Sequence, residues 1–593
     1  MKLSDYVIDF FAKQGVEHNF IVSGGAVIHL IDSTANHSKM EYICAQHEQG
    51  GAAAADMYAR VTRNLGITMT TSGPGATNII TSVCNAYFDS IPMICVTGQV
   101  ARFRIKKSKK LRQKGFQETD VVSVFESITK YAKLVLDPLE IRYELEKAVY
   151  IAKEGRPGPV LLDIPDDLQR IEINPAFLRS FVPEKTISPT LNREIEHLIQ
   201  IIEASNRPII IYGAGIHCSK TENEAVDFAR RYNIPVVLTW GGADLFAHSD
   251  ELNMGCIGVC GPRSGNFAVQ NADLVIAMGT RLSQLITGGK QDLFAPKAKK
   301  VMIDIDSEEL TKFGSDTFMI DLPILSDLSL FYLAMKSYQD PLKSDRFARW
   351  RALIRSWEKK YPICPPEYYE IKDRVSPYVF IKELSRECKE GDIIISDTGA
   401  NLSWTMQAFE TKPGQRIFSA WNNTPMGYSL PASVGAALGL KKEIVCIIGD
   451  GGLMMSLEEL GTVRRHNLPI KIFLFNNKGH GIQKQTIDTW LNSHYSAVDE
   501  STGLYFPDYK KIAEGFRLPF YRISVNQDIR TLIRKVLGHS GPVFCDLEII
   551  ENQKIVPMLK FGGGLEDLDP KIPQEQIDAV REECMQLSYA EMT

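Results

Sequence analysis

The chain has 593 residues, of which 44% are hydrophobic and 23% charged, and its formal net charge is -5 at pH 7. This length predicts several domains, and the slightly acidic charge argues against a general nucleic-acid binder. No apolar run approaches the ~18 residues of a membrane span, and the first residues, MKLSDYVIDFFAKQG, do not resemble a signal peptide. The 11 cysteines are scattered along the chain, as is typical of reduced thiols. We therefore expect a cytoplasmic protein with no membrane and no nucleic-acid partner.

Three stretches of the chain alternate short apolar runs with helical patterns. In chain order the runs are GITMTTSG, IPMICVTG and GPVLLDIP; then RPIIIYGAG, IPVVLTW, DLVIAMGT and KKVMIDID; then GDIIISDTG, EIVCIIGDG, IKIFLFNN and PVFCDLEI. Continuous apolar strands followed by helices predict parallel sheets that are covered on both faces. The predicted fold class is α/β, with three doubly wound parallel-sheet domains.

Two proline-containing polar linkers separate these stretches. They are NPAFLRSFVPEKTISPTLN and the segment from KSYQDPLKSD to YPICPPEYYE. The sequence therefore predicts domains at residues 1–175, 190–340 and 370–550, followed by a tail at residues 551–593. The tail is acidic and contains Gly and Pro near its start, which leaves two interpretations open, a lid and a solvated arm.

The segment GDGGLMMSLEEL follows the apolar run EIVCII and carries a candidate metal site. Asp450 offers a hard oxygen ligand, and Asn477 offers an amide oxygen at the end of the next strand. Mg²⁺ prefers a few protein oxygens together with phosphate oxygens, and glycines let backbone N–H groups approach a diphosphate at a helix start. The alternative is a pair of ordinary strand-end turns.

The first stretch carries a second group of motifs. AQHEQGGAAAADMYAR places Glu48 at a helix entry, where a lone Glu often serves only the helix dipole. SGGAV precedes it, and SGPGATN and GFQETD follow it. Together with the Gly-Asp-Gly segment, NNTPMGYSLPASVGAALG and IVPMLKFGGGLEDL, these motifs resemble the thiamine diphosphate (ThDP) enzymes of the acetolactate synthase group. The resemblance covers nearly the whole chain in the same order.

The resemblance implies a pyrimidine-binding, a central and a diphosphate-binding domain, and it implies roles for individual residues. Glu48 would bond the aminopyrimidine ring and help to remove a proton from the thiazolium, and Met426 would support the cofactor from below. Asp450, Asn477 and the carbonyl group of Gly479 would hold Mg²⁺ on the diphosphate. Residues facing the reacting centre would be Gly25, Ala26, Phe116 and Gln117. Further cofactor contacts would come from Pro74, Asn78, Thr398, Gly399, Asn401, Thr424, Gly451, Gly452, His480, Gly481 and Ile482.

In this family the two domains that meet at one cofactor belong to different chains, so the resemblance implies a homodimer or a dimer of dimers. The expected reaction is decarboxylation of a 2-oxo acid, with pyruvate as the expected substrate, and transfer of the acyl carbanion to an acceptor carbonyl. The acceptor could be a second pyruvate or a nucleotide-linked or phosphorylated keto-sugar, and a plain decarboxylase is a further alternative. A non-catalytic paralogue is disfavoured because Glu48, Met426, Asp450 and Asn477 are all present.

The chain departs from the family at two places. Thr486 follows Gln485 where acetolactate synthases carry Trp, which argues against branched-chain amino-acid synthesis; Trp490, one turn on, could substitute only if the helix rotates. In the central domain, Arg281 is what remains of a motif that binds FAD, and the Gly-x-Gly at residues 213–215 is a weak dinucleotide signal. Bound FAD and an empty vestigial site both stay open.

A basic segment, ARFRIKKSKKLRQK, leads into Phe116 and Gln117. Its cations are Arg102, Arg104, Lys106, Lys107, Lys109, Lys110, Arg112 and Lys114. Such a run is most often a solvated loop. The alternative is a funnel that attracts a phosphorylated, nucleotide-linked or CoA-linked acceptor.

Overall fold

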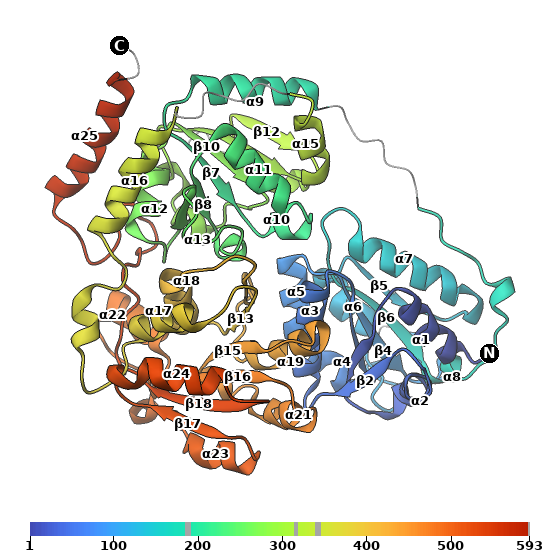
Figure 1. The fold of residues 1–593 in the computed structure, drawn as a ribbon. Helices are drawn as coiled ribbons and strands as arrows, with labels where there is room; N and C mark the ends of the chain where they lie inside the picture. The colour runs from blue at the N-terminus through green and yellow to red at the C-terminus, as the bar shows by residue number, and fades with distance from the viewer. Residues whose placement is uncertain (109, 184–190, 314–317, 339–345, 591–593) are drawn as a thin grey trace.

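The structure is a computed structural model that describes residues 1–108, 110–183, 191–313, 318–338 and 346–590. These residues form three sheets of six strands each, and all strand pairs within the sheets are parallel (Figure 1). Helices cover both faces of the sheets, so the predicted fold class is confirmed. Residues 190 and 340, where the sequence places the limits of the central domain, lie outside the described residues, and the domain boundaries stay predictions.

The N-terminal sheet has the strand order β2-β1-β3-β4-β6-β5. Its strands are β1 (His18–Ile21), β2 (Glu41–Cys44), β3 (Gly66–Thr70), β4 (Met93–Gln99), β5 (Tyr131–Leu134) and β6 (Val160–Pro165). Its helices are α1 (Leu3–Lys13), α2 (Ile28–Ala35), α3 (Glu48–Thr62), α4 (Pro74–Asn78), α5 (Ile80–Asp89), α6 (Val121–Phe125), α7 (Ile141–Lys153) and α8 (Asp166–Gln169).

The C-terminal sheet, with the order β14-β13-β15-β16-β18-β17, repeats the order of the N-terminal sheet strand for strand. Its strands are β13 (Ile393–Ser396), β14 (Arg416–Phe418), β15 (Ile444–Gly449), β16 (Ile470–Asn476), β17 (Phe520–Ile523) and β18 (Val543–Glu548). Its helices are α17 (Pro377–Glu387), α18 (Ala400–Ala408), α19 (Ser429–Leu440), α20 (Asp450–Leu453), α21 (Leu460–Arg465), α22 (Gly481–Trp490), α23 (Tyr509–Gly515) and α24 (Ile529–Leu537).

The central sheet has a different order, β12-β11-β10-β7-β8-β9, which is the order of dinucleotide-binding folds. Its strands are β7 (Pro208–Tyr212), β8 (Val236–Leu238), β9 (Asn253–Cys256), β10 (Leu274–Met278), β11 (Lys299–Asp304) and β12 (Leu322–Leu325). The helices that follow these strands or pack on them are α9 (Asn192–Ala204), α10 (Gly215–Cys218), α11 (Glu222–Tyr232), α12 (Arg263–Asn271), α13 (Gln284–Thr287), α14 (Ser307–Thr311), α15 (Leu328–Met335), α16 (Ala348–Lys360) and α25 (Gln574–Ala590).

The C-terminal sheet joins the other two domains through its two faces. Successive side chains of a strand point to opposite faces. In β15, Ile444, Cys446 and Ile448 belong to the core that continues into the N-terminal domain, whereas Val445 and Ile447 belong to the core that continues into the central domain. The near-continuous apolar runs of the sequence therefore serve two cores at once.

Helices α3 and α19 form the contact between the N-terminal and C-terminal domains. Small residues allow this close approach, since a Cβ on Gly435 would lie 2.0 Å from the carbonyl oxygen of Ala54. The two helices hold equivalent places, because α3 lies between β2 and β3 and α19 lies between β14 and β15. The two similar halves thus meet through the same helix of each.

The tail beyond β18 crosses from the C-terminal domain onto the central domain. Leu559 N–H donates to the carbonyl oxygen of Val259 at 2.7 Å, and Gly562 N–H donates to that of Gly288 at 3.0 Å. Helix α25 then packs beside α16 and α12 (Figure 1). Whether this segment acts as a lid stays a prediction. In the described part of the chain, no helix has the length and apolar character needed to cross a membrane.

Candidate active site

Asp450 lies where β15 ends and α20 begins, and its carboxylate is buried. One oxygen accepts the N–H of Gly451 at 2.7 Å, and the other accepts the N–H groups of Asn477 at 3.1 Å and Gly479 at 3.3 Å. Burial raises the pKa of Asp450 to about 7, although these N–H groups favour the charged form. The structure therefore brings together the three residues that the sequence predicts as a metal site.

This arrangement fits a divalent cation. A buried carboxylate that receives only neutral N–H groups is costly until a positive charge comes close. Among the described residues, no group of three His, Cys, Asp or Glu side chains could hold a metal ion. A cation at Asp450 would therefore take most ligands from amide, carbonyl and phosphate oxygens, as Mg²⁺ prefers.

The glycines beside Asp450 allow close contacts that a side chain would block. A Cβ on Gly451 would lie 2.6 Å from Nε2 of His480 and 3.1 Å from Cε of Met426. A Cβ on Gly452 would lie 2.1 Å from Oδ2 of Asp397. The predicted residues Met426, Gly451 and His480 therefore meet at the start of α20, where backbone N–H groups can receive a phosphate.

Asp397 is a residue of this site that the sequence reasoning missed. Its buried carboxylate accepts the N–H groups of Gly427 at 2.9 Å and Ser429 at 3.0 Å, and thereby fixes the loop that carries Met426. Burial raises its pKa to about 6. The available signal was an Asp directly after the apolar run of β13, at the same sheet edge as Asp450.

Other predicted cofactor contacts lie at this edge. Gly399 has a φ of +106° and Thr424 a φ of +47°. Asn401 donates from its amide to the carbonyl oxygen of Asp397 at 2.7 Å, and a Cβ on Gly481 would lie 3.1 Å from Nδ2 of Asn477. Thr398 follows Asp397 directly, and Ile482 is partly buried against the core.

Glu48 is the first residue of α3, and its carboxylate is half-buried. The side-chain amide of Asn78 donates to Oε2 of Glu48 at 2.9 Å, and a Cβ on Gly75 would lie 3.5 Å from Oε1. Pro74 is the first residue of α4, and Gly75 and Asn78 lie on the same helix. The predicted residues Glu48, Pro74 and Asn78 therefore form one cluster.

The loops with Gly25 and Gln117 lie close to this cluster. Ala26 N–H donates to Oγ1 of Thr71 at 3.2 Å, and a Cβ on Gly73 would lie 2.9 Å from the carbonyl oxygen of Gln117. A Cβ on Gly25 would meet nothing within 4 Å, so this position borders open space. Phe116, beside Gln117, is 84% exposed. Single exposed apolar side chains are common on protein surfaces; together with the open space at Gly25, the exposed Phe116 leaves this side of the cluster accessible to a second surface.

The hydrogen bonds that fix Glu48 and Asp450 lie in separate domains. Glu48 is hydrogen-bonded to a residue of the N-terminal domain, and Asp450 to residues of the C-terminal domain. Within the described residues, no hydrogen bond joins the cluster of Gly25, Glu48, Pro74, Asn78, Phe116 and Gln117 to that of Met426, Asp450, Asn477, Gly479 and His480. Each half of the predicted site is built in its own domain.

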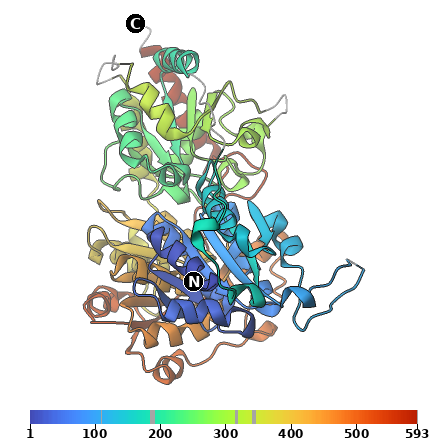
Figure 2. The ribbon, with the colours of Figure 1, turned by 90° about the vertical axis from the view of Figure 1, so that its right-hand side faces the viewer.

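Glu118 organises the basic segment. Its buried carboxylate accepts the N–H groups of Lys106 at 2.7 Å, Lys114 at 2.7 Å and Gly115 at 3.0 Å, which closes the neck of the loop. Beyond this neck the loop extends away from the N-terminal domain (Figure 2). The residues next in the chain, Phe116 and Gln117, are thereby held at the base of an ordered loop.

The cations of this loop fall into two groups. Arg102 pairs with Asp167 at 2.8 Å, and the ammonium groups of Lys106 and Lys114 donate to carbonyl oxygens of the loop itself. Lys107, Lys110 and Arg112 are exposed and make no ion pair with any residue that the structure describes; Arg104 lies over the ring of Phe103. Lys109 lies outside the described residues. Only part of the predicted cation cluster is thus available to a ligand.

Helix α22, where the chain departs from the family, is tied to the tail. The side chain of Gln485 bonds the backbone N–H and C=O of Ile555 at 2.8 and 3.0 Å. Thr486 is exposed and donates to the carbonyl oxygen of Ile482. Trp490 ends the helix, 57% exposed, and Nζ of Lys560 lies 3.9 Å from its ring centre. With Gln485 anchored in this way, Trp490 lies at the tail and not at the place of Thr486.

A cavity of about 190 Å³ opens at the carboxyl ends of the central strands. It is bordered by Gly215, Arg281 and the buried Asp304, whose pKa burial raises to about 6. The Gly-x-Gly segment there serves the fold directly, since a Cβ on Gly213 would lie 2.4 Å from the carbonyl oxygen of Gly279. The glycines therefore do not by themselves indicate a dinucleotide, but the cavity lies where such folds bind one.

Three family models match the chain in the order of its three domains. They are the thiamine pyrophosphate enzyme N-terminal TPP binding domain at residues 1–124, the central domain at residues 195–335, and the C-terminal TPP binding domain at residues 397–547. The chain is 33% identical over 576 residues to acetolactate synthase 2, chloroplastic, of Nicotiana tabacum. These residues are 96% of this chain and 85% of that protein. The chain belongs to the thiamine pyrophosphate enzyme family.

Other relatives of this ThDP enzyme carry similar names. The acetolactate synthase large subunit of Cyanidium caldarium is 32% identical over 571 residues, which are 94% of each chain. That of Parasynechococcus marenigrum is 32% identical over 565 residues, 94% of this chain and 89% of the relative. The predicted resemblance to acetolactate synthases is therefore confirmed.

Proposed function

We propose that the protein is a ThDP- and Mg²⁺-dependent carboligase that decarboxylates pyruvate and transfers the acyl carbanion to an acceptor carbonyl. The observation that carries this proposal is the buried Asp450 carboxylate beside Asn477 and Gly479, in a chain whose relatives along nearly its whole length are acetolactate synthases. The cofactor supplies a thiazolium that stabilises a carbanion. The chain supplies the side chains and backbone groups that would hold and activate the cofactor.

The two clusters divide this work. Asp450, Asn477 and the Gly479 carbonyl would hold Mg²⁺, and the N–H groups at the start of α20 would receive the diphosphate. Glu48 would hold a proton at the aminopyrimidine ring, with Asn78 fixing its carboxylate. Met426 would support the cofactor, because its terminal methyl group lies beside Gly451 at this edge of the sheet.

We propose that two chains build each active site. Within one chain the Glu48 and Asp450 carboxylates have separate partners, and Phe116 exposes 84% of its surface. In a symmetric dimer the N-terminal cluster of one chain would cover the C-terminal cluster of the other, which gives two equivalent sites. Gly25, Phe116 and Gln117 would then line the reacting centre.

We propose FAD as the occupant of the central cavity. The strand order, the position of the cavity beyond the strand ends and the buried Asp304, which can accept from a ribose hydroxyl group, support this proposal. Acyl transfer from pyruvate involves no net redox change, so the flavin would be structural. Visible absorbance of a flavin in the purified protein tests this proposal; a colourless, fully active enzyme would contradict it.

A keto-sugar carrying a phosphate or nucleotide is a second candidate acceptor, favoured by the exposed cations Lys107, Lys110 and Arg112. Their replacement by Gln should raise the KM for an anionic acceptor. The effect should shrink with salt, because exposed charges are screened over about 10 Å at 0.1 M. Pyruvate decarboxylation without acceptor should stay unchanged. An equal loss with and without acceptor would show that the loop only orders Gln117.

The test of the proposed function is a pyruvate assay with competing acceptors. CO₂ release should require both ThDP and Mg²⁺, and mass spectrometry of the products should show which carbonyl compound receives the acyl group. No CO₂ release from any 2-oxo acid, despite bound ThDP, would favour a non-catalytic paralogue. Acetaldehyde as the sole product would favour a plain decarboxylase. The cytoplasmic location and the absence of a nucleic-acid partner stay predictions.

A further inference from the structure

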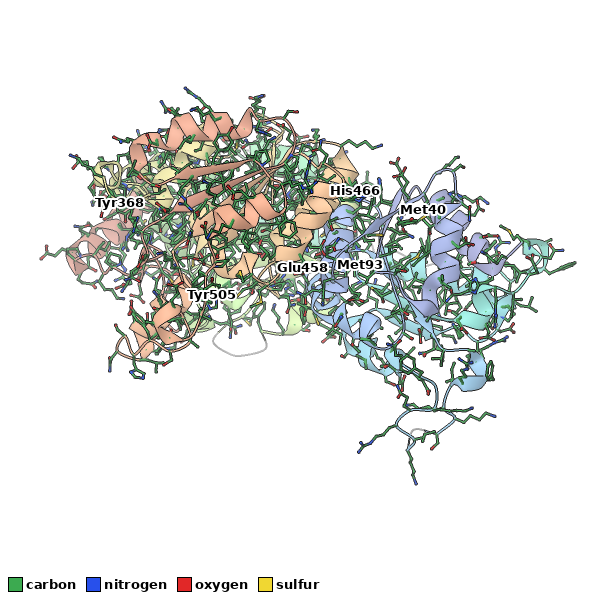
Figure 3. All side chains as sticks on the ribbon, turned by 90° about the horizontal axis from the view of Figure 1, so that it is seen from below. Met40, Met93, Tyr368, Glu458, His466 and Tyr505 are labelled. Carbon is green, nitrogen blue, oxygen red and sulfur yellow. The ribbon has the colours of Figure 1, made fainter. Side chains whose placement is uncertain are left out.

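Glu459 crosses the boundary between the C-terminal and N-terminal domains. It ends a short 3-10 helix, Leu457–Glu459, in the same segment that begins with Asp450. Its Oε1 accepts the backbone N–H groups of Gln46 at 3.0 Å and His47 at 3.2 Å. These are the two residues that precede Glu48. Figure 3 shows the adjacent Glu458 at this boundary.

The surroundings of Glu459 are shaped around its carboxylate. Oε2 accepts the hydroxyl group of Thr462 at 2.7 Å, so the carboxylate receives three hydrogen bonds, and the residue is 1% exposed. A Cβ on Gly50 would lie 2.4 Å from Oε1 of Glu459, so the first turn of α3 has room for this carboxylate only because residue 50 is glycine. A buried carboxylate with all its partners fixes the backbone that it contacts.

The fixed backbone carries Glu48. His47 is the N-cap of α3, where its ring accepts the N–H of Gln49 at 3.1 Å, and Glu48 is the first helical residue. Asn78 holds the carboxylate of Glu48 from one side, and Glu459 holds the chain from the other. Proton transfer requires hydrogen-bond reach, and a misplacement of ~1 Å can cost on the order of 100-fold in rate.

We propose that Glu459 is a positioning residue that fixes the position and orientation of Glu48 across the domain boundary. The proposal rests on the proposed function for the role of Glu48, and Glu459 itself touches neither cofactor nor substrate. Because Asp450 and Glu459 belong to one segment, the turn that would bind the metal is linked to the position of Glu48 in the same chain. In the proposed dimer, Asp450 belongs to one active site, and the Glu48 that Glu459 positions belongs to the other. The segment from Asp450 to Glu459 therefore connects the two sites.

Three variants separate positioning from other roles. Glu459→Ala removes the acceptors of Gln46 and His47. Glu459→Gln keeps them, since its amide oxygen can accept both N–H groups while its NH₂ donates to the Thr462 hydroxyl. Glu458→Ala is the matched control, because Glu458 is the exposed neighbour and contacts neither backbone group. If Glu459→Ala does not fold, Glu459→Asp shortens the side chain by one methylene and makes the same test.

The first measurement uses the protein without cofactor. Hydrogen–deuterium exchange of a peptide spanning residues 41–52 reports the N–H groups of Gln46 and His47 directly. We expect faster exchange, by roughly 10-fold or more, in Glu459→Ala and wild-type exchange in Glu459→Gln and Glu458→Ala. Unchanged exchange in Glu459→Ala would overturn the proposal, and this result does not depend on any assumption about catalysis.

The second measurement uses the holoenzyme. Exchange of the cofactor's C2 proton for deuterium, followed by NMR after acid quench, should slow on the order of 10–100-fold in Glu459→Ala. The ThDP Kd and the pyruvate KM should stay close to wild type, and Glu459→Gln should restore most of the rate. Loss of the amide protection with an unchanged C2 rate would show that Glu459 only anchors α3. A wild-type enzyme without ThDP-dependent C2 exchange would instead overturn the proposed function.

Discussion

The N-terminal and C-terminal sheets share one strand order but carry different chemistry at the same edge. After the third strand of each sheet, the C-terminal domain places Asp450 and two glycines, whereas the N-terminal domain places residues 72–75, Ser-Gly-Pro-Gly. Before that strand, α19 follows the loop with Met426, whereas α3 begins with Glu48. The same sheet edge thus carries different side chains in the two domains, and we propose a metal and phosphates at the C-terminal edge and proton transfer at the N-terminal edge.

The difference also appears in how each carboxylate is surrounded. The Asp450 carboxylate is fully buried and accepts only N–H groups, and burial raises its pKa to about 7. Glu48 is half-buried on the open side of its domain, beside the exposed Phe116. A buried carboxylate such as that of Asp450 can be neutralised by a bound cation, whereas a half-exposed carboxylate such as that of Glu48 can be covered by a second protein surface. This comparison supports our proposal that the two halves of one active site come from different chains.

The largest effect should come from removing the charge of Glu48. Glu48→Gln keeps the shape of the side chain and the bond to Asn78 but cannot take up a proton. We expect a loss of activity on the order of 10²–10⁴-fold at saturating ThDP, with cofactor binding retained. Steady-state kinetics together with ThDP titration measure both. Turnover near wild type would remove Glu48 from the chemistry.

Asp450→Ala should act on cofactor retention in the other half. Without the carboxylate, Mg²⁺ has too few ligands to bridge protein and diphosphate, so the apparent Kd of ThDP should rise by at least about 10-fold. Activity should recover in part at high Mg²⁺ and ThDP. An unchanged ThDP affinity in a calorimetric titration would mean that the Gly-Asp-Gly segment is only a turn.

Gly435→Ala tests the contact that joins the two halves within one chain. Its Cβ would lie 2.0 Å from a backbone oxygen of α3, so the helices must separate. Overpacking of this kind costs about 1–3 kcal/mol and should lower Tm. The control is Gly515→Ala at the end of α23, where a Cβ meets nothing within 4 Å. Equal Tm values for the two variants would contradict a tight α3–α19 contact.

The smallest effect concerns His217 of the central domain, whose two acidic partners form ion pairs with the N-terminal and C-terminal domains. His217 contacts Glu222 at 2.9 Å and Asp244 at 2.7 Å; Glu222 pairs with Arg63 of the N-terminal domain, and Asp244 pairs with Arg416 of the C-terminal domain. Burial opposes the imidazolium, but the two carboxylates outweigh it, so the pKa of His217 is raised. Both ring nitrogens can then donate.

This raised pKa fixes the sign of a pH effect. The stabilisation is complete below the unfolded-state pKa of about 6.5 and is lost as the pH rises through the higher pKa of the folded protein. His217→Gln should therefore lower Tm most near pH 6, and the difference from wild type should shrink toward pH 9. Thermal unfolding across this range measures it, with the exposed His494→Gln as control. A difference that grows with pH would contradict this role of His217.

The sequence predicted the interior of each sheet better than its edges. The apolar runs of β3, β4 and β6, of β7, β8, β10 and β11, and of β13, β15, β16 and β18 all lie inside their sheets. The strands at the sheet edges are short, and β2 is largely exposed, so their sequences lack the continuous apolar pattern that predicted the interior strands. These edge strands are β2, β5, β9, β12, β14 and β17. The interior strand β1, four residues long, was missed as well.

The site shows a similar division. Glu48, Asp450 and Asn477 stand in motifs whose residues are close in the chain, so the sequence indicated them. Asp397 and Glu459 act on backbone N–H groups 30 and more than 400 residues away, and only the folded chain brings these together. In the basic segment the sequence did not show which cations are paired: three of them bind within the N-terminal domain, whereas Lys107, Lys110 and Arg112 are exposed.

Complementation between two inactive chains tests most directly whether each active site is built by two chains. Glu48→Gln and Asp450→Ala chains, carrying different tags, are produced together, and the mixed dimer is purified through both tags. The mixed dimer has one site with both carboxylates intact, so the purified mixed dimer should have about half of the wild-type activity per chain, because one site of two works. Mixed dimers as inactive as the two parent variants would contradict the account and place Glu48 and Asp450 of one chain in the same site.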